Sequence, residues 1–355
     1  MNLFAIIMAG GVGSRFWPRS KKKNPKQLLR IFGENTMIQD TVARISQLCP
    51  KENILIVTNE KQRDGVAEQL PDIPPENIIV EPFGRNTAAC IGLASIIIQE
   101  RASDAVTFVL PADHIIKDTE NFVKTLKAAA QFATENPALV TIGIEPTRPE
   151  TGYGYIQIDE DSGKDNVFKV LTFAEKPNYN TAVNFIKSGD FFWNSGMFIW
   201  RTETIINEIK MHMPDLYEGL IQILDQINSP DFTNILSNIY GQLRSVSIDY
   251  GIMEKSGNVF LVKGNFSWSD VGSWEAVYQL SEKDEDGNVK IGSIYTDMAM
   301  DSYIYSPDKF TAVIGLDNII VINYKDTLLI CKRDKAQDVK NIIDHLKLNK
   351  LNDHL

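Results

Sequence analysis

The sequence predicts a three-layer α/β/α fold with a mixed, mainly parallel sheet, followed by a small C-terminal β region. Short apolar runs alternate with amphipathic helical patterns through the first two hundred residues, which is typical of strands joined by crossover helices. After Gly152 the chain becomes rich in aromatic, strand-like segments. Closely spaced strand-like runs then follow a polar, turn-rich segment at 283–287. We therefore expect two domains, covering 1–285 and 286–355.

The strands expected in the sheet are short runs of branched and aromatic residues. They are Leu3–Met8, Ile54–Val57, Ile78–Val80, Val106–Leu110 and Leu139–Ile144. Apolar residues at helical spacing predict helices over 37–48, 88–98 and 122–132, and Thr181 is expected to cap a further short helix. Parallel sheets bind ligands beyond the carboxyl ends of their strands. The segments 9–15, 81–87 and 111–114 are therefore the first places to look for a site.

The C-terminal region is expected to be all-β except for a closing helix. Its strand-like runs cover 303–305, 311–314, 319–322 and 328–331, and the helix is expected at Asp338–Leu346. The close, even spacing predicts a small β domain made of a few β-helix-like coils, although the runs follow no regular hexapeptide repeat.

The composition narrows the class of protein. Apolar residues make up 43% and charged residues 23% of 355, which is ordinary for a globular protein. A net charge of −10 argues against a nucleic-acid partner. No apolar run reaches the roughly 18 residues of a membrane span, and the N-terminus does not resemble a secretory signal. Three distant cysteines fit buried thiols in a reducing compartment, so we expect a cytoplasmic protein.

A glycine-rich loop with a concentration of positive charge follows the first strand. Ala9, Gly10, Gly11, Gly13 and Ser14 form its start, and no acidic residue appears before Glu34. The basic residues between Ser14 and Glu34 are Arg15, Arg19, Lys21, Lys22, Lys23, Lys26 and Arg30. Glycine lets backbone N–H groups close around an anion, while arginine and lysine contact phosphate directly. The loop predicts a phosphate site; the alternative is an ordinary turn with a solvated basic face.

Two familiar phosphate-binding motifs do not fit this loop. The spacing of a P-loop is absent, and Phe16 stands where the dinucleotide fingerprint requires its third glycine. Pro18 also interrupts the helix that the fingerprint requires. The sequence therefore disfavours a P-loop ATPase and an ordinary nicotinamide-dependent enzyme.

Two aspartates are candidates for a metal site. Asp113 directly follows a buried strand, and Asp270 lies in a polar break between two tryptophans. With no lysine or arginine next to either, a pair of carboxylates suits Mg²⁺, which also binds substrate phosphates. The alternatives are a helix N-cap for Asp113 and a turn residue for Asp270.

Further polar groups follow other strands. Glu81 offers two acceptors that match the N1–H and amine of guanine, although an acid at a helix N-terminus is an equal alternative. Asn194 and Ser195 interrupt an apolar run, where their polar groups need partners such as sugar hydroxyls. Glu175 ends a strand and Gly154 allows a close approach to a ligand, or merely forms a turn.

Seven motifs, taken together and in order, carry a resemblance. AGGVGSRFWPRS, Pro25-Lys26-Gln27, EPFGRNTAAC, LPADH, FAEKP, WNSGMF and WSDVGSW resemble those of mannose-1-phosphate guanylyltransferases, which are sugar nucleotidyltransferases. The similarity covers Leu3 to about residue 280 and implies a Rossmann-like nucleotidyltransferase domain. In length the chain resembles the monofunctional members of this family, which have no isomerase domain.

The resemblance implies a reaction of GTP with mannose 1-phosphate that gives GDP-mannose and pyrophosphate, with Mg²⁺ as cofactor. It assigns catalytic contacts with phosphates to Arg15, Lys26 and Lys176, and metal binding to Asp113 and Asp270. The nucleotide-binding residues that it implies are Ala9, Gly10, Gly11, Gly13, Ser14, Glu81, Arg85, Asn86 and Thr87. The sugar-binding residues that it implies are Gly154, Glu175, Asn194 and Ser195.

Three other functions remain open at this point. One is a related transferase with another sugar or nucleotide, the second is a non-catalytic sugar-nucleotide sensor, and the third is a Rossmann oxidoreductase. We expect no nucleic-acid or membrane partner, and a homodimer through the C-terminal β region is a further hypothesis.

Overall fold

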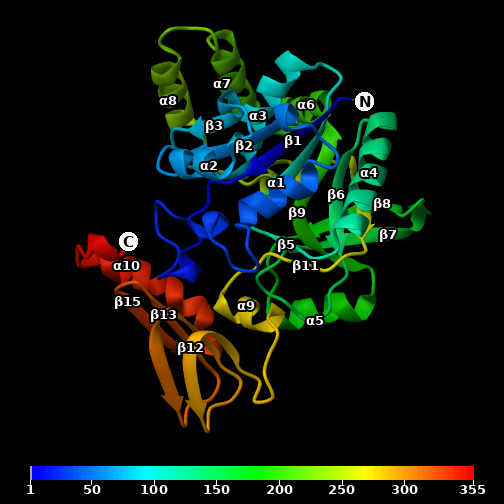
Figure 1. The fold of residues 1–355 in the computed structure, drawn as a ribbon. Helices are drawn as coiled ribbons and strands as arrows, with labels where there is room; N and C mark the ends of the chain where they lie inside the picture. Colours follow the sequence, from blue (N-terminus) through cyan, green and yellow to red (C-terminus); the bar gives the residue numbers. More distant parts are fainter. Residues whose placement is uncertain (1) are drawn as a thin grey trace. The chain divides into compact units, whose positions relative to one another are not determined.

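The computed structural model describes residues 2–355, which divide into two compact units (Figure 1). The sheet unit holds the residues up to Gly10, Asp40–Ala112 and Ile116–Trp268. The loop-and-β unit holds Gly11–Gln39, Asp113–Ile115 and Ser269–Leu355. These are spatial groupings, so the expected domain boundary between 285 and 286 stays a prediction.

The sheet unit contains a nine-stranded sheet in the order β3-β2-β1-β4-β9-β6-β10-β8-β7. The first four are parallel, and β9 lies antiparallel to both β4 and β6. This arrangement confirms the predicted α/β class with a mixed sheet. The strands are β1 (Leu3–Met8), β2 (Ile54–Asn59), β3 (Ile78–Glu81), β4 (Val106–Pro111), β6 (Leu139–Ile144), β7 (Tyr155–Lys164), β8 (Val167–Ala174), β9 (Phe191–Arg201) and β10 (Val259–Gly264).

Helices lie between these strands along the chain. They are α1 (Met37–Ile45), α2 (Arg63–Gln69), α3 (Asn86–Arg101), α4 (Thr119–Glu135), α5 (Tyr179–Ser188), α6 (Thr202–His212), α7 (Pro214–Asp225) and α8 (Phe232–Gln242). Helix α3 is apolar on nearly all sides because it packs against β1 and β2 as well as against α6 and α7. Gly92 lets α7 approach, since a Cβ there would lie 2.6 Å from Leu220 Cδ1.

The predicted cap of α5 was wrong, and the closing helix is confirmed with bounds two residues later than predicted. The cap of α5 is Asn178, whose side chain accepts a hydrogen bond from the Thr181 N–H at 3.0 Å, because Asn178 stands three residues earlier in extended backbone. The helix expected at Asp338–Leu346 begins as a 3₁₀ segment, Arg333–Val339, and continues as α10 (Lys340–Leu348). None of the helices among the described residues is long and apolar enough to cross a membrane.

The loop-and-β unit confirms the expected β-helix-like region. Its strands are β12 (Val289–Asp297), β13 (Tyr303–Ile314), β14 (Ile319–Tyr324) and β15 (Thr327–Lys332), of which the first three are parallel. Helix α9 (Trp274–Leu280) precedes them. The short segments β5 (Ile115–Ile116) and β11 (Trp268–Ser269) each have one residue in either unit, and the 3₁₀ turns Ser14–Phe16 and Lys26–Leu28 belong to the loop-and-β unit.

One hydrophobic core holds this unit together. Phe16 and Trp17 from the glycine-rich loop, Trp274 from α9 and Tyr303 from β13 belong to the same buried cluster. The rings of Phe16 and Trp274 lie 4.9 Å apart, and those of Trp274 and Tyr303 lie 5.8 Å apart. The glycine-rich loop therefore folds onto the C-terminal β region.

Candidate active site

The glycine-rich loop is tightened at Gly13. This residue has φ +67°, and a Cβ there would lie 2.5 Å from Cβ of Lys26. Gly11 would meet nothing within 4 Å, and neither Gly10 nor Gly11 has a positive φ. The expected freedom of glycine is thus used at Gly13, where it lets the loop pass directly over Lys26.

Lys26 connects the two predicted metal-site aspartates. Its ammonium donates to the Asp113 carboxylate at 2.9 Å and to the Asp270 backbone carbonyl at 2.5 Å. The Lys26 side chain is only 5% exposed, whereas that of Asp113 is 37% exposed. The structure therefore brings Asp113 and Asp270 to one cation, although 157 positions separate them in sequence.

The ammonium changes the interpretation of Asp113. The sequence places no lysine or arginine next to this acid, but Lys26 supplies an ammonium from 87 positions away. Burial alone would raise the pKa of Asp113, but the charges of Lys26 and His114 lower it below its ordinary value. Asp113 is consequently held as a carboxylate, which is the form that binds a cation.

The seven cations of the loop do not share one role. Arg15 is exposed, and within the described chain its guanidinium makes no hydrogen bond or ion pair. Arg19 is 7% exposed, donates to the Arg30 carbonyl at 2.7 Å, and lies 4.3 Å from the Tyr305 ring centroid. The structure thus leaves Arg15 available to an anion and gives Arg19 a packing role that its position in the basic run did not predict.

Asp270 lies at the start of a constrained turn. Val271 is fully buried with φ +46°, which is rare for a β-branched residue. A Cβ at Gly272 would lie 3.2 Å from Asp270 Oδ2, so a side chain there would crowd the carboxylate. Backbone strain of this kind persists only where the surroundings enforce it and concentrates at functional sites.

Asp113 and Asp270 fit a divalent metal that is shared with a substrate. Among residues 2–355, no group of three or more His, Cys, Asp and Glu side chains gathers to hold an ion alone. Mg²⁺ commonly uses one or two carboxylates together with substrate phosphates. Two half-buried carboxylates beside a phosphate-type loop are the donor set that this mode of binding requires.

In the sheet unit, Glu81 ends β3 and is only 7% exposed. The hydroxyl of Tyr240 donates to its Oε1 at 2.5 Å. Burial raises the pKa of Glu81 to about 7, although this hydrogen bond acts in the opposite direction. Gly10 lies beside the same carboxylate, since a Cβ there would be 3.5 Å from Glu81 Oε2, and the Ala9 N–H bonds to Val57 on β2.

The residues after Glu81 fix the backbone around it. Arg85 donates to the carbonyls of Tyr240, at 3.0 Å, and Gly241 at the end of α8. The Asn86 side chain accepts from the Thr87 N–H at 2.9 Å, and Thr87 Oγ1 accepts from the Ile248 N–H at 2.8 Å. Their side chains thus serve this framework, and their expected contacts with a nucleotide stay predictions.

Three of the four predicted sugar-binding residues come together in the sheet unit. The Asn194 N–H donates to the Gly154 carbonyl at 2.8 Å, and a Cβ at Gly154 would lie 2.2 Å from Glu175 Oε1. A side chain at 154 would therefore crowd the Glu175 carboxylate. Burial and the charge of Asp249 raise the pKa of Glu175, although Lys176 and Asn194 act against this rise.

Ser195 and Lys176 lie differently from these three. Ser195 is buried, and its hydroxyl donates to the Ile142 carbonyl at 2.6 Å while it also accepts from the Met197 N–H. Its hydrogen bonds therefore go to the backbone of the sheet. Lys176 is exposed, with φ +48°, next to Glu175.

Sequence reasoning missed Asp249. Asn194 Nδ2 donates to Asp249 Oδ1 at 2.8 Å, so this acid orients one of the predicted sugar-binding groups. Burial raises the pKa of Asp249, while its bond with Asn194 lowers it. Asp249 begins a π-helical turn, Asp249–Met253, and such turns occur often at functional sites. The sequence carries no periodicity that distinguishes this turn from an α-helix.

Comparisons with known proteins agree with this arrangement. Residues 4–287 match the family model "Nucleotidyl transferase", and residues 297–346 match "MannoseP isomerase/GMP-like beta-helix domain". A mannose-1-phosphate guanylyltransferase of Salmonella muenchen is 42% identical over 99% of this chain and 75% of its own length. One from Klebsiella pneumoniae is 40% identical, with the same two coverages.

A solved structure has the same fold over its whole length. It is described as a mannose-1-phosphate geranyltransferase from Thermus thermophilus, with 31% identity and a TM-score of 0.89. The match covers 98% of this chain and 100% of that one. The chain therefore belongs to the nucleotidyl transferase family, among the mannose-1-phosphate guanylyltransferases.

Proposed function

We propose that this chain transfers the guanylyl group of GTP to mannose 1-phosphate, giving GDP-mannose and pyrophosphate. Membership of the guanylyltransferase family supports this reaction. The observation that carries it is the contact of one buried ammonium, Lys26, with both Asp113 and Asp270 beneath a phosphate-type loop. The sugar phosphate is already an anionic nucleophile, so the protein needs to position it and neutralise charge during an in-line displacement.

The residues of the loop-and-β unit are assigned to the phosphates. Backbone N–H groups of Gly11, Gly13 and Ser14 and the exposed guanidinium of Arg15 would bind the triphosphate of GTP. Lys26 would contact the α-phosphate as its charge changes. Nucleotidyl transferases generally use a divalent metal, and we assign Mg²⁺ to Asp113 and Asp270. Bound there, Mg²⁺ would neutralise phosphate charge.

The residues of the sheet unit are assigned to the base and the sugar. As a carboxylate, Glu81 would accept from the N1–H and amine of guanine, with Ala9, Gly10, Arg85, Asn86 and Thr87 around the nucleoside. Gly154, Glu175 and Asn194 would bind mannose hydroxyls, and Ser195 would hold the strand that carries Asn194. Lys176, which is exposed beside Glu175, would contact the phosphate of the sugar.

The β region is proposed to bind a second copy of this chain. Several large apolar side chains of β12, β13 and β15 are exposed, namely Ile291, Tyr295, Phe310, Ile314, Leu328 and Ile330. Apolar exposure of this extent supports the hypothesis of a homodimer through these strands. Sedimentation at micromolar concentration tests it, and a monomer would contradict it.

One reaction tests the function itself. The purified chain with Mg²⁺, GTP and mannose 1-phosphate is expected to yield GDP-mannose and an equal amount of pyrophosphate. Parallel reactions with other nucleoside triphosphates and with glucose 1-phosphate separate this function from that of a related transferase. Binding of GDP-mannose without turnover in any mixture would instead favour a sensor.

A further inference from the structure

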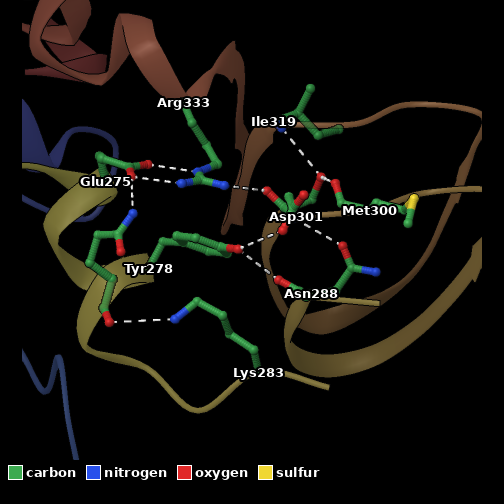
Figure 2. Close-up of polar contacts among 11 residues, drawn as sticks. Glu275, Tyr278, Lys283, Asn288, Met300, Asp301, Ile319 and Arg333 are labelled. Atoms are coloured by element: carbon green, nitrogen blue, oxygen red, sulfur yellow. Dashed lines mark hydrogen bonds and ion pairs between the residues drawn. The ribbon is translucent and has the colours of Figure 1, made fainter. Parts of the chain in front are cut away.

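A network of polar contacts joins α9 to the β strands (Figure 2). Arg333 donates through Nε and Nη2 to the two carboxylate oxygens of Glu275, at 2.7 and 2.8 Å. Its remaining nitrogen, Nη1, donates to the Asp301 carbonyl at 3.0 Å. A single guanidinium thus holds a side chain of α9 and a corner of the β region at the same time.

The geometry of this pair distinguishes it from an ordinary surface ion pair. Both contacts with Glu275 are short and parallel, which is the bidentate arrangement that arginine makes and lysine cannot. The side chains of Arg333 and Glu275 are 16% and 29% exposed, so solvent screens them only partly.

Tyr278 of α9 strengthens the same junction. The Arg333 guanidinium lies 3.6 Å from the centroid of its ring, and its hydroxyl donates to the Gly287 carbonyl at 2.9 Å and the Asp301 carboxylate at 3.3 Å. In Figure 2, Arg333 and Lys283 lie on opposite sides of this ring. Gly287, whose carbonyl accepts one of these bonds, has φ +75° and lies against the same carboxylate, since a Cβ there would be 2.4 Å from Asp301 Oδ1.

Helix α9 links this junction to the predicted metal site. It begins four residues after Asp270, and the residues between them include the buried, strained Val271. Trp274, the first residue of α9, donates to the Trp17 carbonyl at 3.2 Å and packs on Phe16 of the glycine-rich loop. Movement of α9 would therefore displace both the Asp270 carboxylate and the loop.

We propose that Arg333 is a positioning residue for the predicted metal site, because it fixes α9 and, through α9, the turn that carries Asp270. The β region would then take part in the organisation of the catalytic site through one arginine. This inference rests on the proposed function, since the metal-binding role of Asp270 is part of that proposal.

The test is Arg333→Met, which keeps the length of the stem and removes all five donors. We expect the Mg²⁺ concentration for half-maximal activity to rise roughly tenfold, as for other residues that orient metal ligands. Binding of Mn²⁺ in the presence of GTP, measured by electron paramagnetic resonance, should weaken about as much. The KM for mannose 1-phosphate should change by less than about twofold, since Arg333 contacts none of the predicted sugar-binding residues.

Lys290→Met is the matched control. Lys290 makes a partly exposed ion pair with Asp284, at 2.7 Å, in the same β region and without contact with Glu275. The Lys290→Met variant should have the Mg²⁺ dependence and Mn²⁺ affinity of the wild type. Arg333→Lys, which retains the charge but loses the bidentate contact, should lie between the wild type and Arg333→Met. If Arg333→Met does not fold, Glu275→Gln tests the same junction with a smaller change.

The outcomes separate this inference from the proposed function. Wild-type Mn²⁺ affinity and Mg²⁺ dependence in both Arg333→Met and Glu275→Gln would overturn the positioning role while leaving the transferase reaction intact. A fall in kcat and a rise in both KM values by similar factors, with metal affinity unchanged, would also overturn the positioning role. That result would indicate a purely structural role. A wild-type protein that makes no GDP-mannose would refute the proposed function instead.

Discussion

The acidic groups of the predicted site have pKa values that are shifted in opposite directions in the two units of the molecule. In the loop-and-β unit, the Lys26 ammonium helps to hold the pKa of Asp113 below its ordinary value. In the sheet unit, burial raises the pKa of Glu81, Glu175 and Asp249, whose hydrogen-bond partners include the neutral groups Tyr240 and Asn194. Asp113, which is assigned to a metal ion, is thus kept charged. The acids of the sheet unit, which are assigned to the base and the sugar, are poorly solvated, and this favours their neutral form. A ligand that donates hydrogen bonds would stabilise the charged form of these acids.

The largest effect is expected at Lys26. Lys26→Met should lower kcat by about 10²–10³, because a positioned cation stabilises charge in the transition state. It should not weaken the binding of Mn²⁺ with GTP and should tighten it if Lys26 competes for Asp113. Steady-state kinetics and Mn²⁺ titration measure the two effects. Near-wild-type turnover would remove Lys26 from the catalytic site.

Glu81 should make stability depend on pH. Its pKa is about 7 in the folded protein against 4.5 for an ordinary glutamate, so the folded state keeps its proton to higher pH. The stabilisation that this provides is complete below pH 4.5, and about 3 kcal/mol should be lost as pH rises from 4.5 through 7. Urea unfolding of Glu81→Gln across this interval should show a flatter dependence. Parallel curves for the two proteins would show that Glu81 is not the cause.

Gly13 and Gly11 form a matched pair for stability. Gly13→Ala should lower the free energy of unfolding by about 2 kcal/mol or more, because it adds a Cβ at positive φ against Lys26. Gly11→Ala should change it by less than about 0.5 kcal/mol, since open space surrounds that position. Denaturant titration of both variants checks this, and equal losses would contradict the geometry of the loop.

The smallest effect is expected from the contact of Asn194 with Asp249. Asp249→Ala should raise the KM for mannose 1-phosphate by roughly fivefold, because an oriented side-chain amide contributes about 1 kcal/mol. Asn194→Ala and the double variant complete a cycle in which the two changes should not add. Additive effects on KM would show that Asp249 does not act through Asn194.

The sequence predicted what depends on local pattern. The apolar run Leu3–Met8 is β1 to the residue, and the position of Gly13 in a tight turn follows from its chemistry. The segments with weak or mixed patterns were missed, among them α8 and β12. Their own sequence patterns are weak, and packing against neighbouring elements stabilises them, as the parallel pairing of β12 with β13 illustrates.

In the candidate site, too, the sequence predicted individual residues but not the tertiary contacts between them. The sequence motifs predicted Lys26, Asp113 and Asp270 as site residues, but only the fold shows that Lys26 contacts the other two. Arg19 has the same charge as Arg15, yet Tyr305 and Trp274 take it out of solvent. Asp249 has no sequence signal because its partner, Asn194, lies 55 positions away on β9. Pairings of this kind are decided by tertiary packing.

The central claim is that the phosphate of the sugar displaces pyrophosphate directly, with the protein supplying position and charge. The most direct measurement uses GTP with a chiral α-phosphorothioate, mannose 1-phosphate and Mg²⁺, and determines the configuration of the product by phosphorus-31 NMR. We predict inversion at the α-phosphorus, as a single in-line displacement requires. Retention of configuration would reveal a covalent guanylyl-enzyme and contradict the account.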